Sequence, residues 1–89
     1  MPYISPPRRE AYSLFKQAAK ETRIDNPGEL AYLICWACDQ YVGGHLMEFS
    51  LLNGVVGALE SCKIEFVRNM LVPYEQGKQA GNGDVWRQG

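Results

Sequence analysis

The sequence predicts an all-α domain, folded as a small bundle of three helices. Apolar residues recur at intervals of three and four along most of the chain. Two proline-containing helix starts precede such runs, and the alternating apolar pattern of strands is absent outside the termini. With 89 residues, the chain makes a single domain over 1–89. We expect helices at about 6–22, 27–42 and 50–76, followed by an irregular tail over 77–89.

The first helix is expected to start at Ser5 and Pro6. The Ser5 hydroxyl can accept a free backbone N–H, and proline suits the first helical position because the N–H there has no helical partner. One face of this helix then turns toward the core. It carries Ala11, Leu14, Phe15, Ala18 and Thr22.

The second helix has the clearest start signal in the chain. Asn26 is a capping residue, Pro27 occupies the first helical position, and Glu29 lies three residues after the cap. Gly43 and Gly44 provide the turn that ends the helix. Its apolar stripe is Leu30, Leu33, Ile34, Ala37, Cys38 and Tyr41.

The third helix is the longest, and its apolar residues cover more than one face. We expect Ser50 or Asn53 to cap it, Pro73 to kink it, and Gly54 with Gly57 to let another backbone cross closely. A helix this apolar buries a second side or packs against another copy of itself, so a homo-oligomer is predicted. The main stripe is Leu52, Val55, Leu59, Cys62, Phe66 and Met70, with Val56, Ile64, Val67 and Leu71 beside or opposite it.

The tail after this helix is rich in glycine. Gly77, Gly81 and Gly83 are expected to end regular structure. The tail nevertheless carries Trp86, a side chain that proteins seldom leave fully in water. We therefore expect Trp86 to dock the tail onto the bundle.

The composition is that of a soluble protein without a membrane span. Hydrophobic residues make up 46% of the chain and charged residues 21%, and the longest uncharged stretch has only 11 residues. The N-terminus lacks the apolar segment of a signal peptide. These features predict a cytoplasmic protein.

The chain contains three cysteines and one histidine, which are candidate metal ligands. Cys35, Cys38, Cys62 and His45 would suffice in number for a zinc site, and the Cys35–Cys38 spacing also occurs in redox motifs. Both cysteines of that pair lie in the middle of a predicted helix, however, and free cysteine behaves as a small hydrophobic residue. We expect core cysteines and no bound metal, with a zinc-bearing regulator as a remaining alternative.

No catalytic arrangement emerges from the remaining polar residues. His45 follows two glycines and is interpreted as a solvated or capping residue, while Glu60 and Glu65 do not share a helical face. The glycines around Asn82 neither follow a strand nor open a helix, as a phosphate-binding loop would. The sequence therefore predicts a protein that is not an enzyme and uses no cofactor.

Charge is concentrated at the N-terminal end. Residues 1–23 contain five basic and two acidic residues, whereas 24–89 contain four basic and eight acidic ones. One side of the first helix is lined by basic residues, as either a solvated face or a phosphate-binding edge; these are Arg9, Lys16, Lys20 and Arg23. Binding to duplex DNA would need a more basic domain than one with a pI near 5.7. A small anionic ligand fits the charge better.

Aromatic, basic and amide side chains near the two ends form a candidate ligand set. Aromatic rings stack on bases, asparagine and aspartate bond to base edges or ribose hydroxyls, and arginine binds phosphate. Such a site requires the termini to meet; otherwise the aromatic residues serve to attach both termini to the bundle. The set is Tyr3, Arg8, Arg9, Tyr74, Asn82, Asp84 and Trp86.

The terminal motifs resemble a family of small proteins encoded by bacteriophages and prophages. The similar segments are Met1-Pro2-Tyr3-Ile4, the Asn26-to-Leu30 stretch, the Leu59-to-Phe66 stretch with Pro73-Tyr74-Glu75, and Asn82-Gly83-Asp84-Val85-Trp86. The resemblance implies an accessory protein in the cytoplasm of the host bacterium.

Two functional hypotheses follow. The first is an anti-defence sponge, an oligomer that sequesters a nucleotide second messenger. The second is an inhibitor or adaptor that binds a host protein through the exposed face of the third helix.

Overall fold

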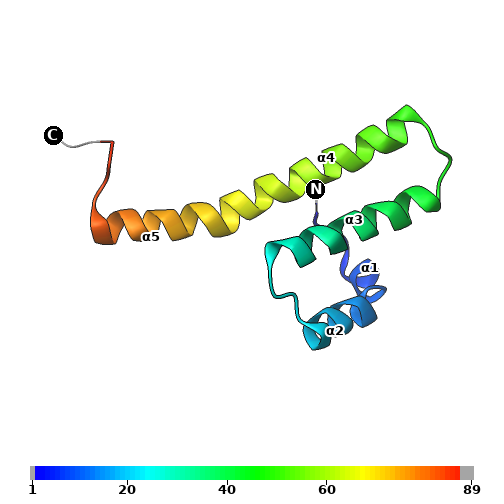
Figure 1. Cartoon of the computed structure of the whole chain (residues 1–89), viewed down its shortest axis with the longest axis horizontal. Coiled ribbons are helices and arrows are strands. Elements are labelled where there is room, and N and C mark those ends of the chain that lie inside the picture. The colour runs from blue at the N-terminus through cyan, green and yellow to red at the C-terminus, as the bar shows by residue number, and fades with distance from the viewer. Residues whose placement is uncertain (1, 87–89) are drawn as a thin grey trace.

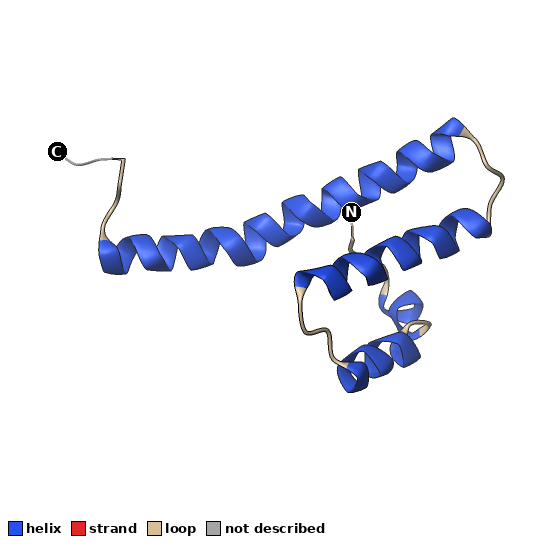
Figure 2. Ribbon diagram, viewed as in Figure 1, coloured by secondary structure: helices blue, strands red, loops and turns tan. Residues whose placement is uncertain are grey.

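A computed structural model describes residues 2–86, and within that part every regular element is helical (Figures 1 and 2). The predicted all-α class is thus confirmed. The elements are α1 (Pro6–Glu10), α2 (Ser13–Thr22), α3 (Pro27–Gly43), α4 (Phe49–Phe66), a π-helix η1 (Val67–Leu71) and α5 (Val72–Asn82). The last three run on without interruption, so residues 2–86 contain four helices where three were expected.

The extra helix arises because the expected helix 6–22 is broken at Ala11 and Tyr12. Their backbone N–H groups bond to the carbonyls of Arg8 and Arg9, three residues back, which tightens the end of α1. Tyr12 then leaves helical geometry, with φ −106° and ψ 11°, before α2 begins. No glycine or proline lies at this break, so the apolar periodicity predicted one continuous helix across it.

The start of α3 agrees with the sequence. The Asn26 side chain accepts a hydrogen bond from the backbone N–H of Glu29 at 2.9 Å. The Glu29 carboxylate in turn accepts the N–H of Asp25 at 2.9 Å. Two of the N–H groups at the helix entrance are therefore satisfied by side chains.

The long helix differs from expectation at both ends. Its N-cap is Glu48, so Ser50 and Asn53 lie inside α4 rather than capping it. At the other end the helix continues to Asn82 and ends at Gly83, whose φ of 92° suits glycine. The expected irregular tail was therefore wrong over residues 77–82.

The helix passes Pro73 through the π-helix instead of stopping there. Proline has no N–H to donate, and its ring crowds the carbonyl four residues back, that of Asn69. In η1 the backbone widens, and the N–H of Val72 bonds to the carbonyl of Val67, five residues back. This wider turn, directly before the proline, lets α4 and α5 form one continuous helix.

Only the first half of the long helix is accompanied by other helices: α3 runs alongside it, and α1 and α2 lie beyond α3 (Figure 1). The chain reverses between α3 and α4, and these two helices lie side by side. The ring centre of Phe15 in α2 lies 6.2 Å from that of Trp36 in α3, and this contact joins the two helices. We call Val67–Asn82 the arm, because this half of the long helix projects beyond the other helices (Figure 2).

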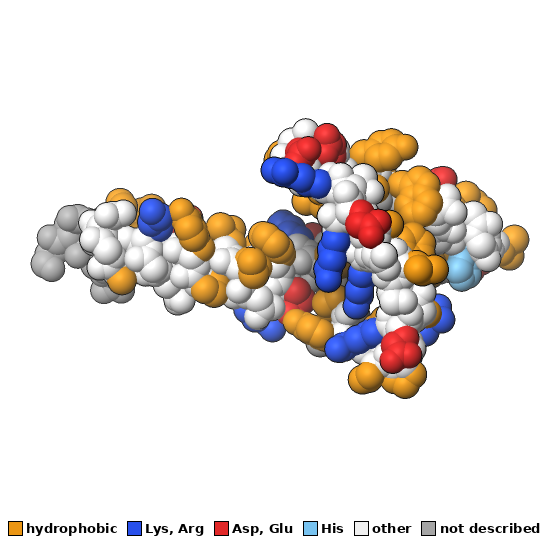
Figure 3. All heavy atoms as spheres, turned by 90° about the horizontal axis from the view of Figure 1, so that it is seen from below, with side chains coloured by type: hydrophobic (Ala, Val, Ile, Leu, Met, Phe, Trp, Pro, Cys, Tyr) orange, Lys and Arg blue, Asp and Glu red, His pale blue; other side chains and the backbone are white. Residues whose placement is uncertain are grey.

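The chain encloses no core of its own. None of the residues 2–86 is buried, and hydrophobic side chains lie open on both the arm and the rest of the surface (Figure 3). The radius of gyration is 17.6 Å, whereas a compact chain of this length has about 12 Å. The exposed area is 8035 Å², whereas a compact monomer of this mass exposes about 5,200 Å². Trp86 is itself 88% exposed, so the expected docking of the tail was wrong within a single chain.

Replacing Asn26 with alanine should lower the free energy of unfolding by about 1 kcal/mol, because α3 loses its side-chain cap. The matched control is Asn53→Ala. Asn53 lies inside α4, where alanine favours the helix, so stability should be unchanged or slightly higher. Urea unfolding followed by circular dichroism, at equal protein concentrations, measures both. Equal losses in the two variants would contradict this assignment of the cap.

Candidate functional site

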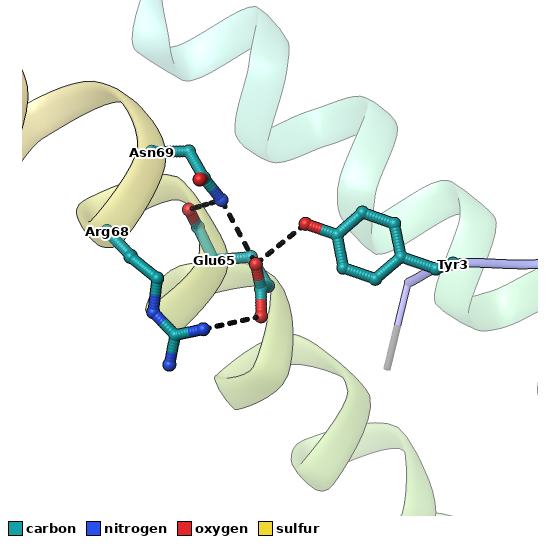
Figure 4. Close-up of polar contacts among 4 residues, drawn as sticks. All are labelled: Tyr3, Glu65, Arg68 and Asn69. Atoms are coloured by element: carbon teal, nitrogen blue, oxygen red, sulfur yellow. Dashed lines mark hydrogen bonds and ion pairs between the residues drawn. The ribbon is translucent and has the colours of Figure 1, made fainter.

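The N-terminal segment is attached to the middle of the long helix through Tyr3 (Figure 4). The Tyr3 hydroxyl donates a hydrogen bond to Oε2 of Glu65 at 2.8 Å. The side chain of Asn69 donates to the same oxygen at 3.0 Å, and also to the Glu65 backbone carbonyl at 2.9 Å. Arg68 lies 3.6 Å from Oε1 of Glu65. The Glu65 side chain is only 15% exposed, so this contact covers part of the long helix.

These contacts shift the pKa values of both partners in opposite directions. The hydrogen bond from Tyr3 lowers the pKa of Glu65 below its usual value, and Arg68 and Asn69 act in the same direction, while partial burial opposes them. The pKa of Tyr3 is raised, first because its hydroxyl donates to the carboxylate. The pair is therefore strongest when Glu65 is charged and Tyr3 is neutral.

Two further members of the predicted ligand set lie close to this attachment in sequence. The Arg8 guanidinium lies 5.4 Å from the centre of the Tyr12 ring and also donates to the Tyr12 hydroxyl at 3.3 Å. Nε of Arg9 donates to the backbone carbonyl of Ile4 at 2.8 Å. Tyr3, Arg8 and Arg9 thus form an exposed, basic N-terminal group.

The other members of the set lie at the far end of the arm. Asn82, Asp84 and Trp86 line an open cleft of about 490 Å³ between α5 and the segment that follows it, which we call the distal cleft. Trp86 donates its backbone N–H to the Asp84 carboxylate at 2.8 Å. Tyr74 lies next to the cleft-lining Lys78, whose ammonium is 5.6 Å from the Tyr74 ring centre. The full lining is Leu71, Val72, Glu75, Gln76, Lys78, Gln79, Asn82, Gly83, Asp84, Val85 and Trp86.

The two groups do not meet within one chain. Tyr3 contacts the long helix at Glu65, and the distal cleft lies beside Asn82; at 1.5 Å per residue the two points are about 26 Å apart along the helix. Figure 1 likewise shows the segment before α1 beside the middle of the long helix, and the segment after α5 beyond the far end of that helix. The structure therefore divides the predicted ligand set into two halves.

The sequence did not single out Glu65, Asn69 and Lys78 as members of these groups. Glu65, Arg68 and Asn69 lie three and four residues apart, so helical periodicity places them on one face. Periodicity gives no sign that Tyr3, which is 62 residues away, reaches that face. Lys78 lies four residues after Tyr74, a spacing that would have indicated the contact between them.

The cysteines and the histidine do not form a metal site in the described part of the chain. Cys35 and Cys62 are exposed and Cys38 is half-buried, so the expectation of core cysteines was wrong within the single chain, where none of the described residues is buried; all three are free thiols. Among residues 2–86, no group of metal-ligating side chains could hold an ion. Nδ1 of His45 lies 2.7 Å from the Tyr41 carbonyl in the last turn of α3, which confirms the interpretation of His45 as a capping residue.

A comparison with known protein families identifies the family of this chain. Residues 1–85 match the family described as Domain of unknown function (DUF6899). The chain belongs to this family. The matched region of this DUF6899 protein contains every member of the predicted ligand set except Trp86. No curated protein and no solved structure gives a significant match.

The helices of this DUF6899 protein differ from membrane spans. Over the described residues, none combines the length and apolar character that crossing a bilayer requires.

Replacing Tyr3 with phenylalanine should raise the pKa of Glu65 toward its usual value, because the carboxylate loses its strongest hydrogen bond. A carboxyl whose folded pKa is depressed stabilises the fold above its unfolded pKa, and this contribution is lost as pH falls through the folded value. Acid unfolding should therefore begin at a higher pH in the variant.

Titration of the Glu65 carboxyl by NMR measures this shift directly. The control is Tyr32→Phe, which removes an exposed hydroxyl from α3 and should leave the titration of Glu65 unchanged. An unchanged Glu65 pKa in Tyr3→Phe would contradict the contact.

Proposed function

We propose that this protein is a non-catalytic binding protein that works as a homo-oligomer and captures a small nucleotide-like anion between its copies. The observation that carries the proposal is the large apolar surface of the single chain. The total exposed area of the chain, 8035 Å², exceeds that of a compact monomer by about 2,800 Å². A standard interface covers only about 800 Å² of each partner, so an excess of this size indicates obligate association.

The nucleotide ligand is supported by the composition of the two halves of the ligand set. In each half, one member forms a cation–aromatic pair with a residue outside the set: Arg8 with Tyr12, and Tyr74 with Lys78. Trp86 offers a largely uncovered indole on which a base can stack. The distal cleft, at about 490 Å³, is an open surface next to that indole where a ligand can be reached from solvent.

The single chain lacks one requirement of such a site. Besides Lys78, the distal cleft is lined by Glu75 and Asp84, so its side chains do not favour a phosphate. The basic N-terminal group has the complementary charge but lies too far away in the same chain. The proposal therefore needs Arg8 and Arg9 to come from another copy.

The biological setting of the proposal rests on the resemblance of the terminal motifs to phage proteins. In the cytoplasm of a bacterial host, an oligomer that binds nucleotides would act as an anti-defence sponge by holding a second messenger away from its receptor. We include this role in the proposal.

A second candidate function is the binding of a host protein through the long helix. The observation that favours it is an exposed apolar face: Val56 is 63% exposed, and Val67 lines a surface groove. Such a face suits binding of a helix in a groove. A charged residue at position 56, which lies outside that groove, would abolish this binding while the homo-oligomer persists, which separates this candidate from the first.

The purified protein should have a mass at least twice the 10.0 kDa of one chain. Size-exclusion chromatography with light scattering, or native mass spectrometry, measures the mass at micromolar concentration. The physical reason is that an isolated chain leaves its apolar faces in water. A stable, folded species of 10.0 kDa would contradict the homo-oligomer.

Trp86→Ala should weaken the binding of a nucleotide by about tenfold to a hundredfold, because a base loses its stacking surface. Arg8→Ala and Arg9→Ala should weaken it through lost phosphate contacts. Isothermal titration calorimetry with ATP, cyclic AMP and a cyclic dinucleotide measures the affinities. The control, Tyr32→Ala, removes an exposed aromatic ring of α3 outside the ligand set. Absence of binding to all three probes, or equal affinity in the three variants and the wild type, would overturn the nucleotide site.

A further inference from the structure

The arm carries two adjoining surface grooves. The distal cleft occupies its outer half, and a second groove of about 420 Å³, here called the proximal groove, lies at its base. Both grooves include Val72, so they follow each other along the same helix. The proximal groove is lined by Glu60, Lys63, Ile64, Val67, Arg68 and Val72.

The two grooves carry opposite excess charge. Among the described residues that line them, the proximal groove has two cations, Lys63 and Arg68, against one carboxylate, and the distal cleft has two carboxylates, Glu75 and Asp84, against one cation; Asp84 also accepts the backbone N–H of Trp86. Arg68 is available for a further contact, because its side chain is 70% exposed and its ion pair with Glu65 is long, at 3.6 Å. The proximal groove and the distal cleft are therefore electrostatically complementary to each other.

We infer that a second copy of this chain binds the arm in antiparallel orientation, about a two-fold axis between Leu71 and Val72. Arg68 lies three residues before Leu71, and Glu75 lies three residues after Val72. The two-fold axis therefore sets Arg68 of each copy opposite Glu75 of the other. Parallel arms would instead set each of these charges beside its own kind, which is unfavourable.

The same axis matches the two grooves position by position. Val67 and Gln76 lie four residues from the centre on either side, and Ile64 and Gln79 lie seven residues from it. Each of these four residues lines one of the grooves. The proximal groove of one copy thereby faces the distal cleft of the other, with Leu71 and Val72 in the apolar middle. A closed, self-complementary interface of this kind is the commonest form of homo-oligomer.

The occupant is a second copy because the area to be covered is too large for a small ligand. The excess of about 2,800 Å² per chain is on the scale of obligate subunit contacts. Paired arms would cover the part of it on η1 and α5. The apolar residues around the turn between α3 and α4, such as Leu46 and Phe49, remain for further copies.

This inference rests on the proposed homo-oligomer and deepens it, because the pairing brings the N-terminal segment of one copy to the level of the distal cleft of the other. Tyr3 contacts Glu65, six residues before Leu71, and Lys78 lies six residues after Val72. Tyr3 of one copy therefore comes level, along the helix axis, with Lys78 of the other, one helical turn from Tyr74 and Asn82. Each pair of chains has two such places.

Charge reversal with mixing tests the pairing in the full chain. Arg68→Glu and Glu75→Arg each set two like charges against each other in their own homodimers, so the dissociation constant of each should rise by about tenfold or more. A 1:1 mixture of the two variants has both pairs attractive and should recover an affinity within about threefold of the wild type. Sedimentation velocity at low salt measures all three, and circular dichroism checks that helix content is retained.

Matched controls and distinct outcomes complete the test. Lys20→Glu in α2 and Glu10→Arg in α1 make the same charge changes away from the arm and should leave the dissociation constant unchanged. If the arm variants associate like the wild type, or if mixing restores nothing, the antiparallel pairing is wrong although the homo-oligomer stands. If the wild-type chain is itself monomeric, the proposed homo-oligomer is wrong, and the pairing that rests on it is wrong as well.

Discussion

The structure depends on one constraint: its helices have almost nothing within the chain to pack against. Ordering each residue costs about 1–2 kcal/mol in backbone entropy, and burial of apolar surface is the main term that offsets this cost. No residue from 2 to 86 is buried, so a single chain obtains little of that term. The polar contacts that join its segments, such as the one between Tyr3 and Glu65, are exposed and weak by comparison. In the proposed homo-oligomer, association supplies the missing burial.

The arm forms because the long helix continues past Pro73. A helix that stopped at Val72 would leave a short rod already flanked by α3, with no projecting surface. The π-helix over Val67–Leu71 keeps the axis running, and α5 then carries Glu75, Lys78 and the distal cleft away from the body. π-turns inside α-helices are often found at functional positions. Here the π-helix lies where the two grooves adjoin, which is also where the inferred two-fold axis passes.

The sequence predicted what depends on local chemistry. The α-class, the boundaries of α3 and its Asn26 cap follow from periodicity and start signals that act within one or two turns. The predictions from sequence were wrong where contacts between distant residues, or a balance of opposing effects, determine the structure. Nothing local breaks the chain at Tyr12, and Gly77 and Gly81 were expected to end a helix that in fact continues to Asn82. The docking of Trp86 was expected because a core was assumed, and the single chain provides none.

The split of the ligand set has a consequence for how binding and assembly are linked. If each site takes its aromatic rings and amides from one copy and its arginines from the other, a bound ligand contacts both and stabilises the pair by mass action. The reverse also holds, since reciprocity requires assembly to raise affinity for the ligand. The Tyr3–Glu65 contact then has a role beyond stability: it fixes the basic N-terminal group at the level of the long helix where the partner's Lys78 would lie. Loss of that contact would leave both grooves intact and yet misplace half of each site.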